Sequence, residues 1–137
     1  MKTRLLPYAI LALVAVVSFR TVPASAHHSF AAEFDASKPI TLVGVVMQVD
    51  WTNPHVWFYI NVKGEDGRMV RWACEMGAPH QLQGRGWLRE TMKIGDTVTV
   101  NGALARDGSR RANARTVTTA DGRTLGAASS GERSGAQ

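Results

Sequence analysis

The sequence predicts a single all-β domain with one short helix. Apolar and polar residues alternate at the spacing of two that strands require, and turns rich in glycine, proline and aspartate separate these runs. The pattern between residues 76 and 96 is interrupted by glycines and allows only a short helix. A chain of 137 residues suits one domain with one modest hydrophobic core.

The first residues have the three-part layout of a secretory signal peptide. Lys2 and Arg4 precede an apolar run over residues 9–19, and the small residues 24–26 follow it. This run is shorter than the roughly 20 residues that a membrane-spanning helix needs. We therefore expect residues 1–26 to be removed as a signal peptide, which would leave a periplasmic or secreted bacterial protein without a stable membrane anchor.

The charge of the mature chain is nearly balanced. Three of the 16 basic side chains (Lys2, Arg4 and Arg20) lie in the predicted signal peptide, so 13 remain against 11 acidic ones. Together with export, this balance leads us to expect that nucleic acid is not a partner. The single cysteine, Cys74, excludes an intramolecular disulfide even in an oxidising compartment.

Three strands are expected in the first half of the domain. The first runs for about 10 residues from Ile40, because apolar residues recur at every second position there. The second follows a turn at residues 52–54. The third runs from Met69 to Glu75, after a hairpin turn in which Asp66-Gly67 supplies the positive φ angles that tight hairpins require.

A short helix over Pro79 to Gln83 and two more strands should complete the domain. The strands are expected at residues 97–105 and around 113–119. The segment 126–137 is rich in glycine, alanine and serine and has little to bury, so we expect it to be disordered. The folded domain would then span residues 27–125.

Three strands, a short helical connection and two further strands form the element order of the five-stranded Greek-key barrel known as the OB-fold. Gly44 would allow the long first strand to bend around the barrel. A small β-sandwich is the alternative, because element order alone does not exclude it. The predicted core consists of Val45, Met47, Phe58, Ile60, Trp72, Val98 and Val100.

Several segments together resemble a family of small exported bacterial proteins catalogued as a domain of unknown function. They read HHSFAAEFD, GVVMQVDWTNPHVWFYINV, WACEMGAP, GRGWLRETMKIGDTVTVNG and RDGSRRANARTVT. The resemblance covers about His27 to Thr119, and it implies an exported β-barrel domain without implying any reaction. Cys74 stands where this resemblance leads us to expect a bulky apolar residue, which argues against a general thiol role in the family.

Cleavage after Ala26 would make His27 the first residue of the mature chain. A terminal histidine offers its α-amine and its ring Nδ1 to one metal ion, and nitrogen donors in a plane suit Cu(II). Cleavage after Ala24 would instead place His27 third, where the amine, two backbone amides and the imidazole could surround Cu(II). The metal hypothesis therefore names His27, His28 and His55, with His55 as a third donor fixed by the turn before it. Alternatively, these histidines are ordinary polar residues.

Aromatic residues suggest a different kind of binding site. Trp57 and Tyr59 point away from the expected core side of the second strand, and Trp51 stands just before the turn. On an OB-fold the outer face of strands two and three binds oligonucleotides or oligosaccharides, so a glycan, another small ligand or a protein partner could bind Trp51, Trp57 and Tyr59. These rings could equally pack beneath the N-terminal segment.

An enzyme is the least supported class of function. The carboxylates lack the spacing of an acid and base pair, and the sequence contains neither a nucleophile elbow nor a phosphate-binding glycine loop. We assign no catalytic residue. The sequence therefore predicts an exported binding module, which binds either copper through its histidines or a metal-free ligand on an aromatic face.

Overall fold

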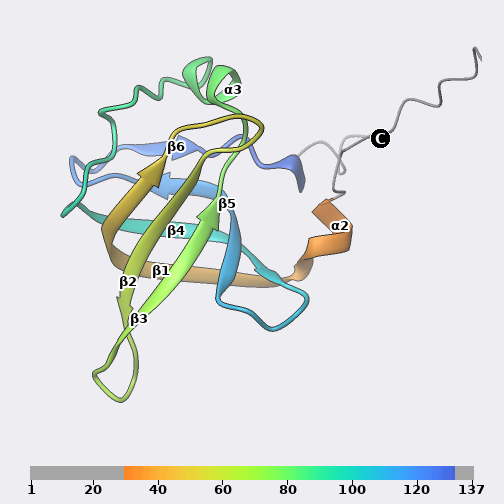
Figure 1. The fold of residues 1–137 in the computed structure, drawn as a ribbon, viewed down its shortest axis with the longest axis vertical. Helices are drawn as coiled ribbons and strands as arrows, with labels where there is room; N and C mark the ends of the chain where they lie inside the picture. Colours follow the sequence, from red (N-terminus) through yellow and green to blue (C-terminus); the bar gives the residue numbers. More distant parts are fainter. Residues whose placement is uncertain (1–29, 132–137) are drawn as a thin grey trace, which may run out of the picture.

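A computed structural model describes residues 30–131 of the chain (Figure 1). His27, His28 and the predicted signal peptide lie outside the described residues. The elements are α2 (Phe30–Glu33), β1 (Phe34–Asp50), β2 (Trp57–Lys63), β3 (Met69–Glu75), α3 (Pro79–Gln83), β4 (Thr97–Ala105), β5 (Arg111–Thr118) and β6 (Thr124–Gly126). The predicted bounds of β3, α3 and β4 agree with the structure, and within residues 30–131 no helix is long and apolar enough to cross a membrane.

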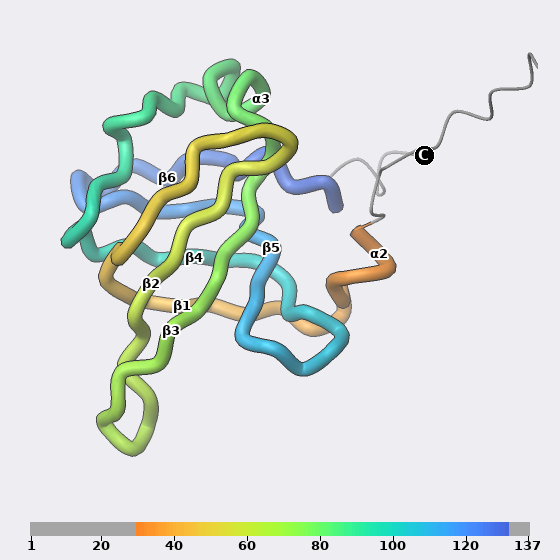
Figure 2. Tube along the Cα trace, viewed as in Figure 1, coloured from red at the N-terminus to blue at the C-terminus, as the bar shows by residue number. Residues whose placement is uncertain are grey.

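Five of the strands close into a barrel with the connectivity of an OB-fold. The strand order is β3-β2-β1-β4-β5-β6, and a parallel pairing between β3 and β5 joins the two sides. The long β1 pairs with β4 along its first part and with β2 along its last part, and it curves through the barrel (Figure 2). The predicted fold class is therefore confirmed, and the β3–β5 pairing is what distinguishes this barrel from an open sandwich.

The barrel interior is filled by the residues that alternate along β2 and β4. Phe58, Ile60, Val98 and Val100 are fully buried, as predicted, and Trp72 is partly buried against them. Further core residues come from the short helix and its following loop, where Leu82 and Trp87 are fully buried. Burial also raises the pKa of the Cys74 thiol to about 12, as expected for a packing residue rather than a nucleophile.

The prediction of which residues of the first strand face the barrel interior is wrong. Val43 is 54% exposed and Met47 is 41% exposed, whereas Leu42 and Val46 are buried. Gly44 is buried between them on the inner face, and a Cβ there would stand 2.8 Å from the carbonyl oxygen of Asn61 on β2. The register then shifts between Val46 and Gln48, so Met47 is an extra residue that points outward. Glycine on the inner face therefore permits the close approach of β1 and β2.

The prediction of disorder from residue 126 onward does not hold for residues 126–131. A sixth strand, β6, pairs with β5, and Ala127, Ala128 and Ser129 behind it are buried. The amide of Gly77 donates to the carbonyl of Ala127, and a Cβ on Gly77 would collide with Ala128. Small side chains are therefore what allows this segment to lie against the barrel, since a larger residue would not fit the space.

Candidate functional site

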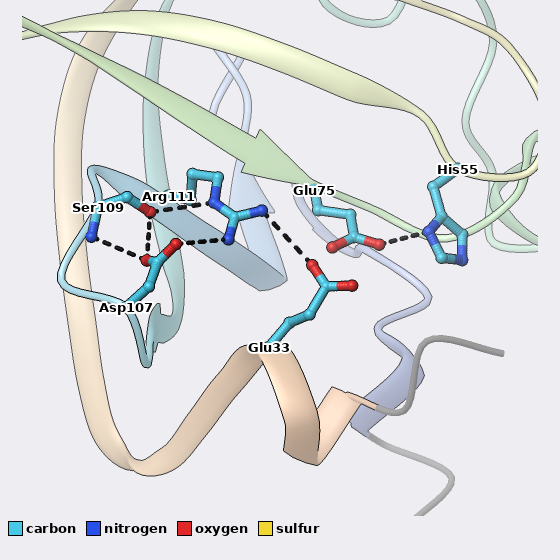
Figure 3. A network of polar contacts seen from close by, with 6 residues as sticks. All are labelled: Glu33, His55, Glu75, Asp107, Ser109 and Arg111. Atoms are coloured by element: carbon cyan, nitrogen blue, oxygen red, sulfur yellow. Dashed lines mark hydrogen bonds and ion pairs between the residues drawn. The ribbon is translucent and has the colours of Figure 1, made fainter.

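His55 and Glu75 meet at one end of the barrel (Figure 3). The imidazole Nδ1 of His55 contacts Oε1 of Glu75. The backbones of the two segments are tied together, because the amide of Val56 donates to Gly77 and the amide of Met76 donates to Val56. His55 precedes β2 and Glu75 ends β3, so the strand pairing itself brings the two side chains together.

The carboxylate of Glu75 is buried, whereas the imidazole of His55 is 34% exposed. A buried carboxylate needs hydrogen-bond or charge partners to offset its desolvation, and the His55 ring provides one. The contact fixes the orientation of the ring. It also engages Nδ1, so a metal ion at this ring would have to bind Nε2, as in carboxylate–histidine–metal arrangements.

The start of the described chain packs near the strand that follows His55. The rings of Phe30 and Phe34 stack with centroids 5.8 Å apart, and both belong to a second apolar cluster with Ala103 and Ala105. Trp57 packs against this cluster. Because Trp57 lies two residues after His55 and opposite Glu75 in the β2–β3 pairing, the cluster places the N-terminal segment at the same end of the barrel.

Arg111 links the N-terminal segment to the turn between β4 and β5 (Figure 3). Its guanidinium lies 3.4 Å from a carboxylate oxygen of Glu33 and 3.0 Å from one of Asp107. Its Nε donates to the hydroxyl of Ser109. Hydrogen bonds from the side chain and the amide of Ser109, with Arg111 as a further cause, hold the pKa of Asp107 below its ordinary value. These contacts fix the Arg111 side chain between the N-terminal segment and the β4–β5 turn.

The three predicted aromatic ligand residues lie in different environments. Trp51 is partly buried against the main core, and Trp57 packs against the second cluster. Tyr59 lies on the outer face of β2, where the guanidinium carbon of Arg71 stands 4.6 Å above its ring. Arg71 also donates to the side chain of Gln48. The polar outer face around Tyr59 is thus distinct from the two tryptophans.

Of the three histidines predicted to bind a metal, only one belongs to the part of the chain that the structure describes. His55 lies at the barrel end with Glu75, while His27 and His28 fall outside residues 30–131. Within residues 30–131 no group of three or more histidine, cysteine, aspartate or glutamate side chains could hold a metal ion.

Glu75, Glu33 and Arg111 did not stand out as site residues in the sequence. Glu75 was visible only as a carboxylate at the end of an apolar strand, with no partner at a recognisable spacing. Its contact with His55 depends on the β2–β3 pairing, and the contact of Arg111 with Glu33 spans 78 positions of the chain. A charged residue at the end of a buried strand is the one local signal that could have identified Glu75.

Comparison with solved structures shows similarity to Rim1, a mitochondrial single-stranded DNA binding protein from S. cerevisiae. The two chains are 14% identical, with a TM-score of 0.48, and the match covers 60% of this chain and 92% of Rim1. This finding contradicts our expectation that nucleic acid is excluded as a partner. That expectation used predicted export and the nearly balanced net charge of the mature chain, whereas binding depends on the charge of one face. At this level of similarity, the match assigns no ligand to this chain.

The resemblance to a family of unknown function is confirmed. No curated protein matches the chain. A family model described as a family of unknown function, DUF6152, matches residues 14–114. This range includes β1 to β4, His55, Glu75 and the first half of β5, and thus most of the barrel. The chain therefore belongs to the DUF6152 family.

Proposed function

We propose that this protein is an exported binding module that holds Cu(II) between its mature N-terminus and His55. The observation that carries the proposal is the pair formed by His55 and the buried carboxylate of Glu75. In a metal-binding histidine, the ring N–H that does not face the metal commonly donates a hydrogen bond to a carboxylate. This bond fixes the orientation of the ring and raises the basicity of the nitrogen that binds the metal. Glu75 would have this role, and Nε2 of His55 would bind the metal.

The length of the intervening chain supports a shared site. Two residues, His28 and Ser29, separate His27 from Phe30 in the sequence, and at about 3.6 Å per residue the three steps can span at most roughly 11 Å. Phe30 belongs to the cluster against which Trp57 packs, close to His55. The proposal requires the α-amine and ring of His27, or the ring of His28, to reach His55.

Export supports the choice of donor and of metal. Removal of residues 1–26 would create the α-amine at His27, and an amine with an imidazole forms a chelate that an internal histidine cannot form. Nitrogen donors favour Cu(II) over the other common divalent ions. Cleavage two residues earlier would give a different chelate with the same ring, so the mature N-terminus has to be identified by mass spectrometry.

The proposal is tested with two proteins that differ only at the start. One begins at His27, and the other carries an extra Met before His27. We expect the first to bind one Cu(II) with nitrogen-rich coordination in electron paramagnetic resonance spectra, and the second to bind at least roughly tenfold more weakly by calorimetry because the amine chelate is lost. His55→Ala and Glu75→Gln should weaken binding only in the protein that starts at His27.

His80 provides the control, because this exposed histidine lies on α3. His80→Ala should leave Cu(II) affinity and spectra unchanged in both proteins. Equal affinities and identical spectra for the native and extended starts would show that the terminal chelate does not exist. The outer face around Tyr59 would then be the better candidate for function.

A metal-free ligand on that face is the second candidate function. It is favoured by the position of Arg71, whose guanidinium carbon stands 4.6 Å from the centre of the Tyr59 ring, because this pair presents hydrogen-bond donors beside an aromatic surface. The side chain of Gln48, which accepts from Arg71 and donates to Asp50, fixes this arrangement. A glycan or another small polar ligand would suit these groups.

A further inference from the structure

We propose that the loop between α3 and β4, residues 84–96, docks the protein on an anionic lipid surface. The inference is independent of the copper site, because it uses none of the residues of that site. Within residues 30–131 the two most exposed large apolar side chains both belong to this loop: Leu88 is 64% exposed and Ile94 is 71% exposed. Figure 2 shows the loop running along the outside of the barrel from α3 to the start of β4. Exposed apolar side chains that gather on one segment are typical of an interaction surface.

The loop is fixed to the barrel by buried side chains and by backbone hydrogen bonds. Trp87 and Met92 are both buried in the main core cluster. The end of the loop is tied to β1, because the amide of Gly95 donates to the carbonyl of Val46 and the amide of Val46 donates to the carbonyl of Asp96, each at 2.8 Å. With these anchors occupied by the core and by β1, the remaining residues of the loop lie at the surface.

Two tight turns carry the exposed apolar side chains. In the first turn the amide of Thr91 donates to the carbonyl of Leu88, and the amide of Leu88 donates to the hydroxyl of Thr91 at 2.8 Å. In the second turn the amide of Asp96 donates to the carbonyl of Lys93, and the amide of Lys93 donates to the carboxylate of Asp96 at 2.9 Å. Ile94 directly follows Lys93 in this turn. The backbone is therefore held in place before a ligand binds, which lowers the entropy cost of binding.

Each exposed apolar side chain has a basic neighbour in the sequence. Arg89 follows Leu88, and Lys93 precedes Ile94. Both basic side chains are exposed, and neither takes part in an ion pair in the part of the chain that the structure describes. The charged side chains of the loop are three basic and two acidic ones, which gives 3 − 2 = +1: Arg85, Arg89, Lys93, Glu90 and Asp96. Apolar side chains beside cations suit an anionic bilayer, because the apolar groups enter the hydrocarbon boundary while the cations stay with the phosphates.

The small size of this apolar surface favours a bilayer over a protein partner. A stable protein interface buries about 800 Å² on each partner, which is far more than two side chains supply. A bilayer needs no complementary surface of that size, since each apolar side chain enters it separately and gains free energy in proportion to the area removed from water. A second copy of the chain is the other occupant that the experiment has to detect.

The test measures binding to sedimented vesicles of phosphatidylcholine, with or without the anionic lipid phosphatidylglycerol. The protein begins at His27, so that the apolar run over residues 9–19 cannot itself bind lipid. We expect binding to the anionic vesicles that weakens at higher salt and on neutral vesicles. Leu88→Ser and Ile94→Ser should each weaken it by at least roughly tenfold, because each removes an apolar side chain from the bilayer. Arg89→Gln should weaken it by roughly fivefold.

Met69→Ser and Arg68→Gln are the matched controls, since Met69 is 55% exposed at the start of β3 and Arg68 is an exposed residue of the β2–β3 hairpin. Arg68→Gln changes the net charge exactly as Arg89→Gln does. Neither control should change vesicle binding. All substituted side chains are exposed, so the variants should unfold at the same urea concentration as the unmutated protein.

Two results would overturn the lipid-binding role of the loop. One is the absence of binding to anionic vesicles, or an equal loss of binding in the loop variants and in the controls. The other is a dimer in sedimentation velocity that Leu88→Ser and Ile94→Ser abolish, because the loop would then bind a second copy of the chain.

Discussion

The side chain of Phe58 illustrates how single residues hold this barrel together. It is fully buried and lies in the main core cluster. In the β1–β2–β3 sheet its neighbours across the strands are Val49 and Cys74. Packing from both adjacent strands leaves the site little freedom to collapse, so a truncated side chain would leave a cavity.

We predict that Phe58→Ala lowers the free energy of unfolding by roughly 3 to 5 kcal/mol, measured by urea denaturation. Val43→Ala is the control, because Val43 is exposed on the outer face of β1 and its truncation should change stability by less than about 0.5 kcal/mol. A loss below about 1 kcal/mol for Phe58→Ala would contradict the packing of β2.

At the level of single residues, only part of the candidate site could be predicted from the sequence. His55 was identifiable because it follows a proline turn and precedes a clearly alternating strand. Its partner Glu75 was not, since their contact arises from the pairing of two strands. Long-range contacts of this kind leave no periodic signal along the chain.

Among the elements, those with one apolar face and clear ends were predictable. β4 alternates Val98 and Val100 with polar residues, and its predicted bounds agree with the structure. β1 has apolar residues on both faces, including Val43, Val45 and Val46, so alternation alone left its phase undecided. The bulge at Met47 then changes the phase within the strand.

The final described segment lacked any such pattern. Residues 126–131 are small, and their burial depends on hydrogen bonds and close contacts with distant elements. The indole Nε1 of Trp87 donates to the carbonyl of Gly126 at 2.9 Å, and the amide of Ala127 donates to the carbonyl of Arg115. Composition alone predicted disorder, because the composition of a segment carries no information about its backbone hydrogen bonds with distant residues.

We predict that ending the chain after Leu125 destabilises the domain, whereas ending it after Gly131 does not. The shorter chain leaves the buried indole N–H of Trp87 without its acceptor and uncovers the core near Ala127, which should cost at least roughly 2 kcal/mol. Urea denaturation followed by tryptophan fluorescence measures both chains. Equal stability of the two would show that residues 126–131 contribute nothing to the fold.

Across the whole molecule, the two ends of the described chain converge at the barrel end that carries His55. A Cβ on Gly131 would stand 2.8 Å from the ring of Phe30, so the last described residue packs on the first. The carbonyl of Ala127 accepts from Gly77, two residues after Glu75. This end of the barrel is therefore built from segments far apart in sequence, and a ligand bound there would stabilise the closed fold as a unit.

We predict that Cu(II) raises the melting temperature of the protein that begins at His27 but not that of the protein with an extra Met. A chelate made only by the amine and ring of His27 would form equally well in the unfolded chain and would leave stability unchanged. A site that also includes His55 exists only in the folded state, so its additional affinity appears as stability. If His55 contributes tenfold in affinity, the gain is about 1.4 kcal/mol. For a domain of this size, each kcal/mol corresponds to roughly 4–8 °C.

The control for this prediction is His55→Ala in the protein that begins at His27. This variant should retain part of its Cu(II) binding through the terminal chelate, because the amine and the His27 ring are unchanged, yet it should lose the rise in melting temperature. Differential scanning calorimetry with and without Cu(II) measures the difference directly. A rise that persists in His55→Ala would mean that the third donor is another residue. No rise in either protein would mean that the terminal histidine binds copper independently of the barrel, and that the His55–Glu75 pair has a purely structural role.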